Sequence, residues 1–67
     1  MKVLVIGSGG REHAICWALN KSKKVDKIYC SPGNAGTGKI AINANIDVLN
    51  FSNLEKFIKK EKIDLVI

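Results

Sequence analysis

The chain contains short, uninterrupted apolar runs, separated by stretches in which apolar residues recur with helical spacing. This pattern predicts an α/β domain with a parallel sheet, because strands that are covered on both faces carry no polar side. Strands are predicted at residues 2–6, 26–31 and 64–67. Helices are predicted at residues 11–21 and 52–62, each of which has an apolar face and a polar face.

The segment between the second strand and the second helix has a less regular pattern. Residues 32–39 are rich in glycine and are predicted to form a loop. From residue 40 onward, apolar and polar residues alternate, which indicates a strand at residues 45–49. The resulting order, β-α-β-β-α-β, predicts a doubly wound, mostly parallel sheet with helices on both faces.

Helical spacing also predicts which side chains face the core and where one helix begins. In the first helix the expected core residues are Ala14, Ile15, Ala18, Leu19 and, beside them, Trp17. In the second helix they are Leu54, Phe57 and Ile58. Ser52 and Glu55 have the spacing of a capping box, so we expect the second helix to begin at Ser52.

Two glycine-rich turns are predicted at the same edge of the sheet. Residues 7–10 follow the first strand, and residues 32–38 follow the second. Ligands of doubly wound sheets bind outside the carboxyl ends of the strands. A turn that exposes backbone N–H groups beside a helix N-terminus suits a phosphate group. The pattern therefore predicts a phosphate site, although a tight turn without a ligand would use the same residues.

Neither turn fits a common nucleotide motif. Gly7 and Gly9 match the dinucleotide fingerprint, but Glu12 stands at the third glycine position and no acid ends the second strand. These departures disfavour NAD or FAD binding. Residues 33–39 match most of a P-loop, but Ile40 has no hydroxyl to bind Mg²⁺, and the strand-like alternation that follows argues against the helix that a P-loop requires.

Four polar residues beside the turns are candidates for contact with a ligand. Arg11 could clamp a phosphate through two hydrogen bonds or face solvent in the first helical turn. Glu12 complements the helix dipole and could also hold a ligand amine or hydroxyl. His13 could donate a hydrogen bond or act as a base, but a lone histidine more often has a structural role. Asn34 could favour the turn or reach a ligand with its amide.

Composition argues against several other classes of protein. The formal net charge of +5 comes mainly from lysine, with a single arginine, which does not fit a nucleic-acid interface. The first apolar run is too short for a signal peptide or a membrane span. Cys16 and Cys30 are expected to be reduced thiols of a cytoplasmic protein, and with His13 they do not make up a metal cluster.

Two blocks of the sequence closely resemble one enzyme family. The blocks are Gly7-Ser8-Gly9-Gly10-Arg11-Glu12-His13-Ala14 and Ser31-Pro32-Gly33-Asn34-Ala35-Gly36-Thr37. Together with the second helix and residues 62–67, they are similar to the N-terminal segment of the phosphoribosylamine–glycine ligases, which are ATP-grasp enzymes. The resemblance covers essentially the whole chain and is weakest at residues 39–50.

The resemblance implies a function and a domain organisation. Members of this family join glycine to 5-phosphoribosylamine in purine biosynthesis, and they convert ATP to ADP and phosphate with Mg²⁺ or Mn²⁺. Their N-terminal domain is a Rossmann-like α/β unit that helps to form the substrate site. The resemblance implies that residues 1–67 are an incomplete, truncated domain of this kind. It places the ATP-grasp and C-terminal domains outside the segment and implies that the segment alone is inactive.

The resemblance also implies which residues contact the phosphoribosyl substrate. They are Gly7, Ser8, Gly9, Gly10, Arg11, Glu12, Pro32, Gly33 and Asn34. Catalytic, cofactor-binding and metal-binding residues are expected outside this segment. The expected partners are the two small substrates and the remainder of the same chain, with no nucleic acid and no membrane. Two alternatives stay open: a nicotinamide-dependent oxidoreductase half-domain and a non-catalytic anion-binding module.

Overall fold

The first strand, β1 (Lys2–Gly7), is an inner strand of the sheet and is buried on both faces. The computed structural model describes residues 1–47 and 49–67. Val3, Leu4 and Val5 have almost no solvent-exposed surface. This burial confirms the prediction from the uninterrupted apolar run, since a strand covered on one face only would expose every second side chain.

Four strands form one parallel sheet in the order β3-β2-β1-β4. Along its whole length β1 pairs with β2 (Lys27–Pro32), in a register that places Gly7 opposite Pro32. On its other side β1 pairs with β4 (Leu65–Val66), and β2 pairs with β3 (Ile42–Asn43). The chain therefore builds outward from β1 in one direction and then crosses to its other side, as in a doubly wound fold.

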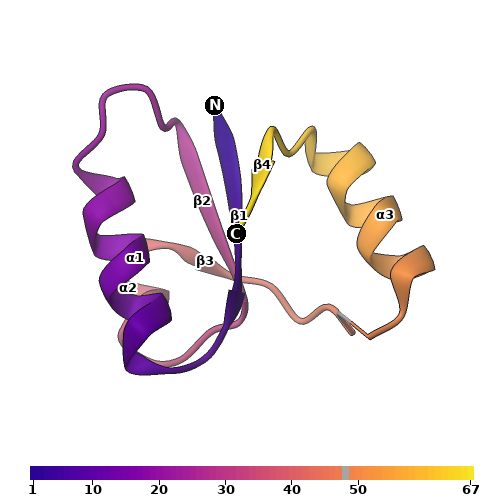
Figure 1. Ribbon diagram of the computed structural model, residues 1–67, viewed down its shortest axis with the longest axis horizontal. Helices are drawn as coiled ribbons and strands as arrows, with labels where there is room; N and C mark the ends of the chain where they lie inside the picture. Colours follow the sequence, from indigo (N-terminus) through magenta and orange to yellow (C-terminus); the bar gives the residue numbers. More distant parts are fainter. Residues whose placement is uncertain (48) are drawn as a thin grey trace.

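Helices lie on both faces of this sheet (Figure 1). On one side are α1 (Gly10–Asn20) and the single turn α2 (Thr37–Ile40), and on the other is α3 (Phe51–Glu61). The core under α1 contains Val3, Val5, Cys16, Ile28 and Cys30. The opposite face is packed more thinly: no residue of α3, all of which is described, is fully buried. Its Phe57 ring meets Tyr29 edge-on at 5.2 Å. The predicted α/β fold with two covered faces is confirmed.

The start of α3 differs from the prediction. Asn50 is the N-cap, and its Oδ1 accepts hydrogen bonds from the backbone N–H groups of Ser52 and Asn53, at 3.1 and 3.3 Å. The predicted capping box at Ser52 is therefore wrong, because an asparagine two residues earlier caps the same turn. Glu55 pairs instead with Lys59 at 2.8 Å. The predicted inner face is confirmed by its half-buried residues, Leu54, Phe57 and Ile58.

The predicted buried stripe of α1 is only partly right. Ile15 and Leu19 pack against the core, and Cys16 is its fully buried residue. The residues predicted as core but found exposed are Ala14, Trp17 and Ala18. The sheet-facing side of α1 is centred between Ile15 and Cys16, which turns these three toward solvent. Trp17 is covered instead by Lys21, whose Nζ lies 3.5 Å from the ring centroid.

The segment after β2 departs most from the prediction. A short turn leads into α2, where a loop as far as residue 39 was expected. The strand is β3, whereas the predicted strand at residues 45–49 is wrong: residues 45–47 and 49 form no strand, and Val48 lies outside the described residues. The Ala44 N–H donates to the Cys30 carbonyl at 2.8 Å, and the ladder stops after this bond because Pro32, next in the pairing pattern of β2, has no N–H to donate.

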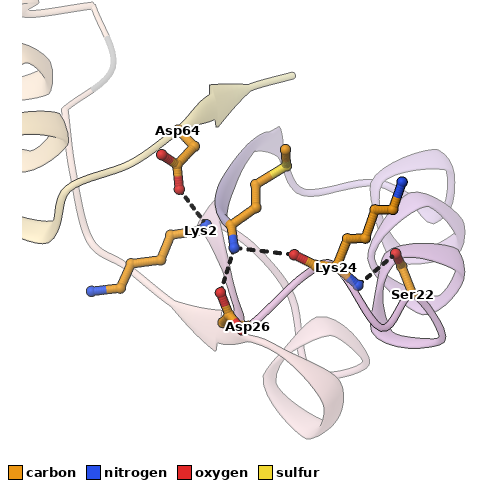
Figure 2. A network of polar contacts seen from close by, with 6 residues as sticks. Lys2, Ser22, Lys24, Asp26 and Asp64 are labelled. Atoms are coloured by element: carbon orange, nitrogen blue, oxygen red, sulfur yellow. Dashed lines mark hydrogen bonds and ion pairs between the residues drawn. The ribbon is translucent and has the colours of Figure 1, made fainter.

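Polar contacts fasten the amino ends of the strands (Figure 2). The N-terminal ammonium of Met1 donates to the Asp26 carboxylate and, at 3.0 Å, to the Lys24 carbonyl. The Lys2 N–H donates to Asp64 Oδ2 at 2.8 Å. These contacts hold β1 beside β2 and β4 at the end of the sheet opposite to the glycine turns. The two glycine-rich turns lie at the carboxyl ends of β1 and β2.

Candidate functional site

Two loops meet where β1 and β2 end. We refer to residues 7–10 as the first loop and to residues 33–36 as the second loop. Both begin at the same level, because β1 and β2 are in register as far as their last residues. The Gly33 N–H donates to the Gly7 carbonyl at 3.0 Å, and the Asn34 side-chain amide donates to the Ser8 carbonyl at 2.7 Å. The predicted juxtaposition of the two glycine turns is therefore observed.

Glu12 closes the first loop from the helix side. Its Oε2 accepts a hydrogen bond from the Gly9 N–H at 3.1 Å, so the carboxylate caps α1 at a position where glycine has no side chain to do so. Its side chain folds over Gly7, where a Cβ would lie 2.3 Å from Glu12 Cγ. Glu12 thus fills the space above the first loop, and β2 ends at Pro32 without an acid. Both features argue against a dinucleotide at this site.

The N-terminus of α1 forms an exposed rim of hydrogen-bond donors. The first intrahelical hydrogen bond runs from the His13 N–H to the Gly9 carbonyl at 3.1 Å. The N–H groups of Gly10, Arg11 and Glu12 precede it and have no acceptor within the helix. Arg11 has a side chain that is 86% exposed, and its Nη2 lies 3.7 Å from Glu12 Oε1. Amide donors, a guanidinium and the positive end of the helix are therefore gathered at one place.

A ring of three hydrogen bonds, missed by the sequence reasoning, holds the second loop. The Asn34 N–H donates to Thr37 Oγ1 at 2.7 Å, the Thr37 hydroxyl donates to Asn43 Oδ1 at 2.7 Å, and the Asn43 amide donates to the Asn34 carbonyl at 2.8 Å. The same hydroxyl also lies 3.0 Å from the Asn34 carbonyl. In addition, the Thr37 N–H donates to Asn34 Oδ1 at 2.9 Å. We call these three residues the Asn34 ring.

The glycines of the second loop make room for side chains. A Cβ on Gly33 would lie 2.0 Å from Asn43 Oδ1, and one on Gly36 would lie 2.6 Å from His13 Cε1. The ring of His13 therefore packs against the second loop, which is the structural role considered for it. The single helical turn α2 begins within the P-loop-like stretch and ends at Ile40, which offers no hydroxyl, and the strand β3 follows it, in agreement with the expectation that no P-loop helix begins here. The glycines at Gly33 and Gly36 are explained by the side chains of Asn43 and His13 that pack against them.

The structure places the predicted site residues at one edge but exposes them unequally. Those exposed to solvent are Ser8, Gly9, Gly10, Arg11 and Pro32. Those partly buried are Gly7, Glu12, Gly33 and Asn34. Contact of these residues with a ligand stays a prediction. The sequence reasoning missed Thr37 and Asn43; the two glycines of the second loop, Gly33 and Gly36, indicate only that side chains such as Asn43 and His13 pack closely there.

Two buried thiols lie beneath the first loop. Cys16 and Cys30 are both free and fully buried. Burial raises the pKa of the Cys16 thiol to about 11, and the neighbouring Cys30 adds to the shift. The Cys30 thiol donates a weak hydrogen bond to the Gly7 carbonyl at 3.5 Å. At neutral pH the Cys16 thiol stays protonated, which makes it a poor nucleophile and metal ligand.

The described residues do not form a metal site. Within residues 1–47 and 49–67, no group of three or more His, Cys, Asp or Glu side chains is placed to hold a metal ion. The groups exposed at the loop edge are N–H donors and a guanidinium, which suit an anion. In the same part of the chain, no helix combines the length and the apolar character needed to cross a membrane.

These features define a Rossmann-like α/β domain with a rim of exposed hydrogen-bond donors at the carboxyl ends of its strands. The sequence profile of one family, described as "Phosphoribosylglycinamide synthetase, N domain", matches residues 1–67. The chain belongs to this family. The resemblance that rested on the two glycine-containing blocks is thereby confirmed.

Curated relatives match over the whole of this chain but extend far beyond it. The chain is 54% identical over 67 residues to the phosphoribosylamine–glycine ligase of Caldanaerobacter subterraneus subsp. tengcongensis, and 46% identical to that of Clostridium acetobutylicum. It is also 48% identical to part of the trifunctional purine biosynthetic protein adenosine-3 of Gallus gallus, covering 7% of that protein. The chain spans 16% of the length of the two ligases.

Proposed function

We propose that this chain is the N-terminal, substrate-binding part of an ATP-dependent ligase that joins glycine to 5-phosphoribosylamine. The observation that carries the proposal is identity of 54% and 46%, over the whole chain, to two proteins named phosphoribosylamine–glycine ligase. In this proposal the full-length protein converts ATP to ADP and phosphate, works in purine biosynthesis in the cytoplasm, and binds ATP outside residues 1–67. The segment alone is inactive.

The exposed rim of α1 is the proposed site for the phosphate group of 5-phosphoribosylamine. The N–H groups of Gly10, Arg11 and Glu12 supply directed donors, and the Arg11 guanidinium supplies a full positive charge. Gly10 and Arg11 are exposed to solvent, and a Cβ built on Gly10 would contact no residue outside its own helical turn, so the surface beside these donors is open. The Gly9 N–H is already bound to Glu12 and is not needed for the phosphate.

Glu12 is the proposed contact for the amine or a ribose hydroxyl of the same substrate. One carboxylate oxygen, Oε2, accepts from the Gly9 N–H, whereas Oε1 lies 3.7 Å from Arg11 Nη2, too far for a strong hydrogen bond. Oε1 is therefore available to accept a hydrogen bond from the amine. Such a bond orients the amine and leaves its lone pair available to attack the activated carboxyl group of glycine.

The second loop borders the same site from the side of β2. Pro32 is exposed at the end of β2, and Gly33 and Asn34 are tied to the first loop through the Gly7 and Ser8 carbonyls. In the proposal these residues fix the position of the bound sugar. Holding a reactant in place is a major contribution to catalysis, because the entropy of alignment is lost before the chemical step.

Mg²⁺ belongs to the remainder of the protein in this proposal. When bound with ATP, it neutralises negative charge on the transferred phosphate. The described residues do not fit such a site, since they offer no cluster of carboxylates and the loop edge presents N–H groups. The role left to this segment is to bind and orient the phosphoribosyl substrate.

The proposal is tested with the purified full-length protein that carries this segment. With glycine, 5-phosphoribosylamine, ATP and Mg²⁺ present, we expect ADP and the glycine amide of the amino sugar to form in equal amounts. Omission of either glycine or the amino sugar should stop ADP release. Saturable binding of NAD(P)H without ligation would favour the oxidoreductase alternative. Anion binding without any turnover would favour the non-catalytic module.

A further inference from the structure

The Asn34 ring joins three separate elements behind the proposed substrate site. Asn34 belongs to the second loop, Thr37 to α2 and Asn43 to β3. We propose that Thr37 and Asn43 are positioning residues for the phosphoribosyl substrate, which hold the second loop, and through it the first loop, in the binding conformation before the substrate arrives. This inference rests on the proposed function.

The ring leaves Asn34 almost no conformational freedom. Its backbone N–H and its carbonyl are both hydrogen-bonded within the ring, and its side-chain Oδ1 accepts from the Thr37 N–H at 2.9 Å. Thr37 is itself 0% exposed, so water does not compete for its hydroxyl. The remaining group of Asn34, its side-chain NH₂, is directed at the first loop. Asn34 therefore acts on the substrate site mainly through the first loop.

The contact of Asn34 with the first loop determines where backbone donors point. Its Nδ2 lies 2.7 Å from the Ser8 carbonyl and 3.4 Å from the Gly9 carbonyl. In a planar trans peptide, the N–H of the next residue points opposite to the carbonyl. Holding these two carbonyls therefore directs the Gly9 N–H toward Glu12 and the Gly10 N–H away from Asn34, into the rim that is proposed to bind phosphate.

Two glycines accommodate the side chain that closes the ring. A Cβ on Gly33 would lie 2.0 Å from Asn43 Oδ1, and a Cβ on Gly38 would lie 3.0 Å from Asn43 Nδ2. The Asn43 amide thus packs between two backbone segments, of which the one at Gly33 leaves no room for a side chain and the one at Gly38 leaves little. Gly38, which seemed part of a P-loop-like spacing, has its physical explanation here.

Loss of the ring should reduce the apparent affinity for the sugar substrate more than the maximal rate. If the loops occupy the binding conformation for only a fraction of the time, the apparent dissociation constant rises in inverse proportion to that fraction. Once substrate is bound, the loops are held and turnover proceeds. ATP is proposed to bind elsewhere, so its KM should not change.

The experiment uses the full-length enzyme with Thr37→Val, which keeps the side-chain shape but removes the hydroxyl, and Thr37→Ser, which restores the hydroxyl. Asn43→Ala is the second ring variant; the substitution shortens a side chain on the edge strand β3 and leaves the hydrophobic core unchanged. Ser31→Ala is the matched control, since Ser31 is equally buried and its hydroxyl donates to the Ile46 carbonyl, outside the ring. For each variant, kcat, the KM for 5-phosphoribosylamine, the KM for ATP and the thermal unfolding midpoint are measured.

We expect the KM for 5-phosphoribosylamine to rise about tenfold or more in Thr37→Val and in Asn43→Ala, because each substitution removes two of the three hydrogen bonds of the ring. Thr37→Ser should keep the wild-type KM, and Ser31→Ala should lower the unfolding midpoint without changing KM. The inference is overturned if both ring variants keep the wild-type KM, if their KM for ATP rises equally, or if Ser31→Ala has the same effect. If the wild-type enzyme has no ligase activity, the proposed function is wrong, and the inference that rests on it is wrong as well.

Discussion

The side-chain amide of Asn34 donates a hydrogen bond to the carbonyl of Ser8 at 2.7 Å, across 26 residues of sequence. The two residues follow β2 and β1, which end in register, so a single side chain connects the two loops at the level where both begin. This contact makes the loop edge one unit. The conformation of the first loop therefore depends on residues of the second.

Asn34→Asp should remove the hydrogen bond to Ser8 and leave the backbone hydrogen bonds of the Asn34 ring in place. The carboxylate keeps an acceptor for the Thr37 N–H but loses the donor, and it places negative charge against the Ser8 carbonyl. In the full-length enzyme we expect the KM for 5-phosphoribosylamine to rise about tenfold or more. Asn53→Asp, an exposed site in the first turn of α3, is the control. Equal KM values for Asn34→Asp and wild type would contradict the coupling of the loops.

Gly36→Ala should destabilise the protein, because a Cβ at this position would lie 2.6 Å from His13 Cε1 and the ring would have to move. We expect a loss of about 1–3 kcal/mol in the free energy of unfolding, which is typical of overpacking. Gly10→Ala is the comparison, since a Cβ there meets nothing within 4 Å and alanine favours a helix. Urea unfolding of the full-length protein measures both. An equal loss in the two variants would show that His13 does not limit this position.

Asp26 should contribute to stability in a way that depends on pH. Hydrogen bonding and charge attraction from the N-terminal ammonium lower the pKa of its carboxyl below the ordinary 3.8. The contribution is therefore present above pH 3.8 and is lost as the pH falls through the lower folded-state pKa. Asp26→Asn should lower the unfolding midpoint at pH 7, and the difference from wild type should shrink toward pH 3. A difference that is the same at both pH values would be inconsistent with this ion pair.

Chemical accessibility of the buried thiols provides a further test. Because burial raises the pKa of Cys16 to about 11, its thiolate is scarce at neutral pH. We expect Cys16 and Cys30 in the folded protein to react with iodoacetamide at pH 7.5 far more slowly than in urea. Mass spectrometry of the labelled peptides follows each cysteine separately. Labelling of Cys16 at the same rate with and without urea would contradict its burial.

Much of the fold could be predicted because the relevant signal is local. The apolar run at Val3–Ile6 predicts a doubly covered strand, and the glycines that follow predict a turn at the end of that strand. The first residue of α3 is harder to predict. Asn50 and Ser52 are both good N-cap residues two positions apart, and sequence alone does not decide which of them caps the helix. Side-chain geometry decides in favour of Asn50.

The Asn34 ring could not have been predicted in the same way. Asn43 reaches Asn34 only because β3 pairs with β2 at residues 42–43, and alternation of apolar residues does not determine that register. The prediction at residues 45–49 was wrong for this reason. Glu12 is a second case. Its position in the first helical turn predicted an interaction with the helix dipole, whereas the packing of its side chain over Gly7 depends on tertiary geometry.

Arg11 tests the central claim, that this segment binds the phosphate of the sugar substrate. Arg11→Ala removes an exposed guanidinium whose contact with the Glu12 carboxylate is a long one of 3.7 Å, so folding should be unaffected. Arg11→Lys keeps the charge but not the paired geometry and should be intermediate. Lys23→Ala, which removes an exposed cation in the turn after α1, is the control.

The most direct measurement is the KM of the full-length enzyme for 5-phosphoribosylamine, compared between wild type and Arg11→Ala at saturating ATP and glycine. A lost charge-assisted contact predicts an increase of about tenfold to a hundredfold. The KM for ATP should stay at the wild-type value. If instead the KM for 5-phosphoribosylamine is unchanged, or if only the KM for ATP rises, the first loop does not hold the substrate phosphate.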